Sequence, residues 1–197
     1  PGLTSPLSEI TSRPRKYGFH GTLKPPFRLA EGADLDALTA AVAKLARGRG
    51  QISIPELCLR RIGGFLALVP EGDQAALSAL AADVVTGLDA FRAPLSADDL
   101  ARRRGRGLRA DLDANLLRWG YPHVLDAFRF HLTLTGPLPR AQTECVPRIA
   151  TQYFAPHLPR PFRVEDICLV GEDQDNRFRL IQRFPLLGSG SSSPLNG

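Results

Sequence analysis

The chain has 197 residues, of which 43% are hydrophobic and 23% are charged, so it is large enough to bury the core of one ordinary domain. No apolar run approaches the roughly 18 residues that cross a bilayer, which argues against a transmembrane protein and a membrane partner. Three cysteines without a Cys-x-x-Cys pair argue against a disulfide framework and a thiolate zinc site. The net charge of +5 favours an anionic partner and leaves both phosphate substrates and RNA open.

The first half of the chain is predicted to run from a strand through a helix into a hairpin. Its elements are, in chain order, a strand over 16–23, a helix that Asp34 caps, and strands over 51–59 and 65–69 that straddle a turn at Gly63-Gly64. Helical patterns follow over 73–90, from a capping box at 96–99, and over 108–119 before Gly120.

The second half repeats this order. Its elements are a strand over 128–135, a short helix with Pro147 in its first turn, and strands over 162–170 and 177–184 around a polar turn. The pattern predicts an α+β fold of two pseudo-symmetric lobes, each an antiparallel sheet with outer helices, around a central cleft.

We expect a single two-lobed domain over 1–187. Its expected parts are lobe 1 at about 13–90, a helical connection at about 91–125, lobe 2 at about 126–187, and a flexible tail over 188–197. The N-terminal residues show no signal peptide, so we expect a cytoplasmic protein, and we expect it to be a monomer.

An internal repeat supports the two halves. The pattern Phe-His-x-Thr-Leu-x-x-Pro begins at Phe19 and returns 111 residues later at Phe130, with five identities in eight positions. A second echo places Cys58 and Cys168 in similar acidic-aliphatic-Cys-Leu segments 110 residues apart. We expect the two cysteines to be equivalent and buried.

Each repeat places a histidine and a threonine on one face of a strand, because side chains at i and i+2 point the same way. These pairs are His20 with Thr22 and His131 with Thr133, while Phe19 and its counterparts should face the apolar layer. If the two strands meet, one neutral imidazole can accept a proton while the other, protonated, donates one, and the threonines can bind phosphoryl oxygens. This combination is typical of a phosphodiester site.

The paired motifs His20-Gly21-Thr22-Leu23 and His131-Leu132-Thr133-Leu134 resemble those of the 2H phosphoesterase superfamily, which includes cyclic phosphodiesterases and RNA 2′-5′ ligase-like proteins. Segments such as Trp119-Gly120-Tyr121-Pro122 look like its bacterial branch in phosphonate-metabolism operons. The resemblance implies metal-independent chemistry on a small cyclic phosphate, with His20 and His131 as catalysts and Thr22 and Thr133 as substrate-binding residues. Family members usually carry a strand well before the first motif, and only nineteen residues precede His20 here.

Further substrate-binding candidates lie beside the motifs. Lys24, Arg129 and Thr135 share the parity of the catalytic pairs, and Tyr17 joins them if a bulge near Gly18 changes its direction. No metal or cofactor is implied, because the acidic stretch at 172–176 lacks the pattern of a calcium loop.

These residues predict a hydrolase for a ribose or nucleoside cyclic phosphate. The alternative is an RNA-binding or RNA end-processing protein that uses the arginine-rich stretch from Arg102 to Arg109 as a platform. We expect that stretch near the mouth of the cleft.

Overall fold

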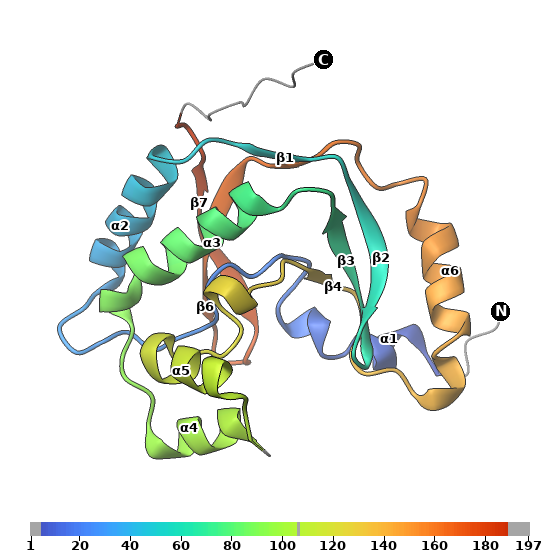
Figure 1. Cartoon of the computed structure of the whole chain (residues 1–197), viewed down its shortest axis with the longest axis horizontal. Helices are drawn as coiled ribbons and strands as arrows, with labels where there is room; N and C mark the ends of the chain where they lie inside the picture. The colour runs from blue at the N-terminus through green and yellow to red at the C-terminus, as the bar shows by residue number, and fades with distance from the viewer. Residues whose placement is uncertain (1–4, 106, 189–197) are drawn as a thin grey trace.

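The computed structural model describes residues 5–105 and 107–188, and its helices and antiparallel sheets confirm the α+β fold (Figure 1). Arg106 and all but the first residue of the expected 188–197 tail lie outside the described residues. In the part of the chain that is described, no helix is both long enough and apolar enough to cross a membrane.

Two β-hairpins form the framework of the molecule. In the first, β2 (Glu56–Ile62) pairs antiparallel with β3 (Phe65–Glu71), and in the second, β6 (Asp166–Glu172) pairs with β7 (Phe178–Pro185). Both hairpins turn where the sequence predicts, at glycines in the first and at a polar loop in the second.

Short strands connect the two halves. β1 (Ile52–Ile54) and β5 (Phe162–Val164), which precede the two hairpins, pair antiparallel with each other. β4 (Leu132–Thr133) comes from the second half but adds to β3 of the first, as the third strand of the sheet β2-β3-β4. Neither half therefore completes its sheets alone.

The helices that follow the motifs are also exchanged between the halves. α2 (Leu35–Arg47) begins as predicted at Asp34, whose carboxylate accepts a hydrogen bond of 2.7 Å from the amide of Ala37. It packs against β6 and β7, whereas α6 (Cys145–Phe154) packs against β2 (Figure 1). The hairpin of each half is thus covered by the helix of the other half.

The segment between the first hairpin and the second motif is helical, as its periodicity predicts. It contains α3 (Ala75–Gly87), η2 (Asp89–Phe91), α4 (Ala97–Arg104) and α5 (Ala110–Trp119). Ser96 caps α4 through a hydrogen bond of 3.1 Å from the amide of Asp99, and Gly120 ends α5 with a φ of 76°. The remaining short elements are α1 (Leu7–Ile10), η1 (Pro14–Lys16), η3 (Leu125–Ala127) and η4 (Arg140–Gln142).

The two motif strands are much shorter than expected. In the first, the turn of η1 and the positive φ of Gly18 redirect the chain, and only Gly21 forms a bridge, to Leu132. In the second, the regular ladder ends where the amides of Leu134 and Thr135 both donate to the carbonyl oxygen of Leu66. The predictions of regular strands over 16–23 and 128–135 were wrong for these reasons.

Two burial predictions were also wrong. Phe19 is 65% exposed, because the turn at Gly18 interrupts the alternation that would direct it inward. Cys58 and Cys168 are equivalent, since each is the third residue of the first hairpin strand, but Cys58 is half-buried and Cys168 is exposed. Their neighbours Leu57 and Ile167 face the core instead.

Gly21 lies where a side chain would collide with Phe130. A Cβ at Gly21 would lie 2.3 Å from ring atoms of the buried Phe130, so we expect Gly21→Ala to lower the free energy of unfolding by about 1–3 kcal/mol, measured by urea denaturation. Gly64→Ala is the matched control, because its Cβ would meet only Pro137, at 3.6 Å.

The same collision predicts coupling between the two positions. Phe130→Leu should cost less stability in the Gly21→Ala background than in the wild type, because the smaller side chain relieves the overlap. Strictly additive losses would contradict this account of Gly21.

Candidate active site

The two histidine motifs meet at one antiparallel bridge, in which Gly21 lies opposite Leu132. Directly opposite residues on antiparallel strands share a face. This face is apolar, because Leu132 and Phe130 are buried and the ring of Phe130 covers Gly21. The bridge thus packs one face of both motifs against the hydrophobic core.

The catalytic candidates occupy the other face. If the register of this single bridge extends by one residue, His20 lies opposite Thr133 and Thr22 opposite His131. Opposite residues have Cβ atoms about 4.5–5.5 Å apart. From this register we expect each imidazole to lie near a hydroxyl of the other repeat.

Both imidazoles are held in the same way by the backbone. The Nδ1 atom of His20 lies 3.1 Å from the carbonyl oxygen of Gly18, and that of His131 lies 2.8 Å from the carbonyl oxygen of Arg129. Because a carbonyl oxygen only accepts, each Nδ1 must carry the proton, which leaves Nε2 as the nitrogen that can accept one. In His20 this Nε2 lies 3.0 Å from the hydroxyl oxygen of Thr22.

Aromatic rings flank each histidine. The ring of Tyr17 lies 6.2 Å from that of His20 and 5.0 Å from that of Phe178, and the ring of Phe65 lies 5.8 Å from that of His131. Tyr17 thus lies beside the first catalytic candidate. The sequence analysis missed Phe65 and Phe178, although each begins the second strand of its hairpin and extending the repeat to the turns would have paired them.

Lys24 lies against α3 and η2. Its ammonium group donates a 2.9 Å hydrogen bond to the carbonyl oxygen of Val85 and lies 3.6 Å from the carboxylate of Asp89, and its side chain is 6% exposed. Burial lowers the pKa of Lys24, and the nearby Asp89 offsets part of that effect. Burial alone would raise the pKa of Asp89, but hydrogen bonds and charge from Arg92 and Lys24 outweigh it and lower that pKa.

Two other candidates have backbone partners. The guanidinium of Arg129 is exposed and donates to the carbonyl oxygens of Asp126 and Phe128, at 3.0 and 2.6 Å. Thr135 is 5% exposed, and its hydroxyl oxygen accepts a 3.0 Å hydrogen bond from the amide of Leu66. Thr135 therefore supports the sheet.

The arginine-rich stretch is largely neutralised within the connection. Its pairs are Arg102 with Asp99, Arg104 with Asp113 and Arg109 with Asp111. Hydrogen bonds from these arginines lower the pKa of each aspartate. Among residues 5–105 and 107–188, no group of three or more His, Cys, Asp or Glu side chains is arranged to hold a metal ion.

Comparisons with known proteins identify relatives along nearly the whole chain. A family model described as protein of unknown function (DUF1045) matches residues 22–179. A protein of Janthinobacterium sp. (strain Marseille) named ribose 1,5-bisphosphate phosphokinase PhnN is 37% identical over 194 residues, which cover 96% of this chain and 43% of the relative.

A protein of Laribacter hongkongensis (strain HLHK9) with the same name is 36% identical over 180 residues, which cover 90% of this chain and 41% of the relative. The chain therefore spans less than half the length of these two curated relatives.

Asp89 is the carboxylate on which the buried cations depend. We expect Asp89→Asn to lower the free energy of unfolding by about 1–3 kcal/mol at neutral pH, because it leaves Lys24 and Arg92 without their shared counterion. Asp111→Asn is the control, since that side chain is 58% exposed and pairs with the exposed Arg109.

The loss at Asp89 should depend on pH. Because folding lowers the pKa of Asp89, its contribution is present above the unfolded pKa and disappears as the pH falls through the folded pKa. Urea denaturation at several pH values measures this, and a difference from wild type that persists in strong acid would contradict the assignment.

Proposed function

The chain belongs to the DUF1045 family, and we propose that it is a metal-independent hydrolase that opens a small cyclic phosphate by acid-base catalysis between His20 and His131. One observation carries the proposal. Two motifs from separate halves meet at a single bridge, and in both of them a backbone carbonyl holds Nδ1 so that Nε2 is the reactive nitrogen.

The proposed reaction uses the two Nε2 atoms in opposite protonation states. The neutral imidazole removes a proton from a water molecule as its oxygen forms a bond to phosphorus. The imidazolium donates a proton to the ester oxygen whose bond to phosphorus breaks. The hydroxyls of Thr22 and Thr133 donate to the non-bridging oxygens, where negative charge increases in the transition state.

The names of the relatives suggest the substrate. Ribose 1,5-bisphosphate carries phosphates at both ends of the sugar, and hydrolysis of a 1,2-cyclic phosphate that also bears a 5-phosphate would produce it if O2 is the leaving oxygen. We therefore propose that this ribose cyclic phosphate is the substrate, within phosphonate metabolism.

We do not assign the phosphokinase activity in the relatives' names to this chain. The 197-residue sequence contains no Gly-Lys pair and hence no Gly-x-x-x-x-Gly-Lys-Ser/Thr motif for nucleotide phosphates. More than half of each relative lies outside the aligned region. We assign the kinase activity of the relatives to that remaining part, and the cyclic phosphate chemistry to the part that this chain matches.

The two histidines can be tested with variants that preserve the backbone contact. Asparagine keeps an N–H donor near the place of Nδ1 but lacks Nε2, so we expect His20→Asn and His131→Asn each to lower kcat at least ~100-fold. The double variant should be little worse than the poorer single variant, because the two residues act as one unit. Thr22→Val should cost only about 1–3 kcal/mol of transition-state stabilisation.

The control is His157→Asn, an exposed histidine beside Tyr153 on α6. Wild-type activity should survive EDTA and fall on both sides of a pH optimum, since one imidazole must be neutral and the other protonated. Activity that is abolished by EDTA and restored by a divalent metal would refute this mechanism.

The leaving oxygen can be read from the product. With ribose 1,2-cyclic phosphate 5-phosphate as substrate, we expect ³¹P NMR to show conversion of the cyclic resonance into ribose 1,5-bisphosphate. Formation of ribose 2,5-bisphosphate would mean that O1 leaves. The product would then differ from the ribose 1,5-bisphosphate in the names of the relatives.

A further inference from the structure

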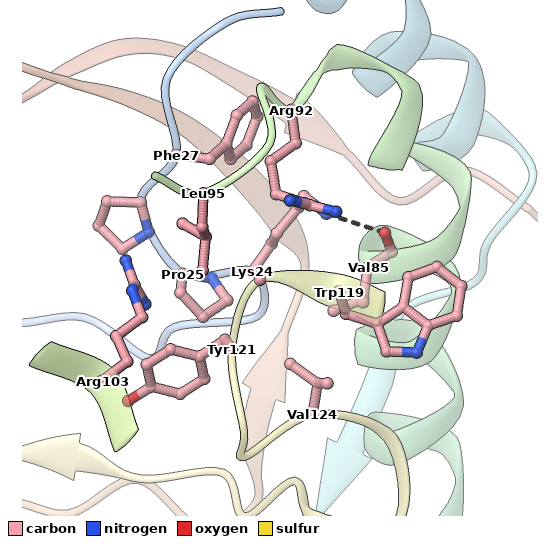
Figure 2. Close-up of a pocket in the computed structure, with 12 residues that line it drawn as sticks. Lys24, Pro25, Phe27, Val85, Arg92, Leu95, Arg103, Trp119, Tyr121 and Val124 are labelled. Atoms are coloured by element: carbon pink, nitrogen blue, oxygen red, sulfur yellow. Dashed lines mark hydrogen bonds between the residues drawn. The ribbon is translucent and has the colours of Figure 1, made fainter. Parts of the chain in front are cut away.

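A cationic pocket is lined by residues that adjoin both histidine motifs in the sequence. One wall is formed by Lys24 and Pro25, directly after the first motif, and another by Tyr121 and Val124, which lead into the second motif. Figure 2 shows Lys24 and Arg92 on one side of this pocket and Arg103 with Tyr121 on the other. The pocket also accounts for the Trp119-Gly120-Tyr121-Pro122 segment, for which the catalytic proposal gives no role.

Positive charge exceeds negative charge around this pocket. The carboxylate of Asp89 is the shared partner of Lys24, Arg92 and Arg118, at 3.6, 2.8 and 3.9 Å. One carboxylate thus serves three cations before Arg103 is counted. Such an excess of positive charge attracts an anion. The free volume of the pocket is about 10 Å³, close to that needed for one water molecule, so a phosphate group enters only when the lining side chains move apart.

Arg103 is the cation without a counterion. Its guanidinium carbon lies 5.6 Å from the centre of the Tyr121 ring, and no carboxylate of the described residues lies within ion-pair distance. Its Nε atom is buried and has no hydrogen-bond partner among the described residues. A buried donor without an acceptor is costly, and a ligand oxygen would satisfy it.

Arg92 and Gly120 form the wall of the pocket opposite Arg103. Gly120 has a φ of 76°, and a Cβ there would lie 3.0 Å from Nη1 of Arg92. The glycine therefore lets the Arg92 guanidinium lie directly against the backbone at the end of α5. Arg92 is held there by Asp89 and by a 3.1 Å hydrogen bond to the carbonyl oxygen of Arg118.

We propose that this pocket binds a second phosphate group of the substrate, with Arg103 as the main ligand and Lys24 and Arg92 supplying positive potential. The assignment rests on the proposed cyclic phosphate chemistry, which needs only the two histidine motifs. It adds a binding site for the second, terminal phosphate, which lies on C5 of a ribose or on the 5′-oxygen of a nucleoside 2′,3′-cyclic phosphate.

Kinetics with paired substrates tests the pocket. We expect Arg103→Ala to raise KM at least ~10-fold for ribose 1,2-cyclic phosphate 5-phosphate, with little change in kcat, and to leave KM for ribose 1,2-cyclic phosphate unchanged. Arg102→Ala on the same helix is the matched control, because Arg102 is exposed and paired with Asp99. Adenosine 2′,3′-cyclic phosphate with and without a 5′-phosphate distinguishes the nucleotide source.

A purely structural role for Arg103 gives a different result. If it only fastens α4 to Tyr121, Arg103→Ala should lower the melting temperature and alter KM equally for both members of each pair, which would overturn the proposal. Arg103→Lys keeps the charge without the planar guanidinium, and should recover part of the preference for the second phosphate.

Phosphate binding in the pocket can be tested independently of the proposed hydrolysis. Binding of inorganic phosphate is measured by calorimetry in the His20→Asn/His131→Asn background, which removes both catalytic Nε2 atoms. We expect binding to persist there, to weaken at least ~10-fold on adding Arg103→Ala and to be unaffected by adding Arg102→Ala. Equal phosphate affinity with and without Arg103 would overturn the pocket whatever the wild-type enzyme hydrolyses.

Discussion

One backbone bridge joins the two halves at the place where the chemistry is proposed. Gly21 and Leu132 can lie opposite each other because glycine leaves space for the ring of Phe130, which closes the apolar face of the bridge. Strand alternation predicts that the two histidines and two threonines lie on the other face. The exchanged helices and the pairing of β1 with β5 hold the two hairpins around this point. The proposed site is thus a product of the interface between the halves.

Much of this arrangement could be predicted from the sequence. The repeat identified the motifs, and hydrophobic periodicity with caps such as Asp34 and Ser96 located the helices. The hairpins followed from strand patterns around recognisable turns. The lengths of the motif strands could not be predicted, because they depend on Leu66, whose carbonyl oxygen receives two amides from a segment far along the chain. The exchange of helices between halves leaves no trace in local pattern, since either hairpin would bury the same apolar face.

The site departs from symmetry in ways that suit its proposed task. Two imidazoles in identical surroundings would be equally suited to the roles of acid and base. Here the Tyr17 ring packs near both His20 and Phe178, whereas Phe65 packs near His131. His20 also contacts the hydroxyl of its own repeat, Thr22. The two Nε2 atoms therefore have different surroundings within the same backbone frame.

The pairing of β1 with β5 has a consequence for how the protein folds. Residues 52–54 pair with residues 162–164, and Gly21 pairs with Leu132. The contacts that join the two halves therefore link segments more than one hundred positions apart. Such topology has a high contact order, which slows folding because the entropy of closing long loops is lost before those contacts form. During synthesis, the first hairpin would emerge with β3 lacking its third strand, and its exposed edge would be a place for wrong pairing until the second motif arrives.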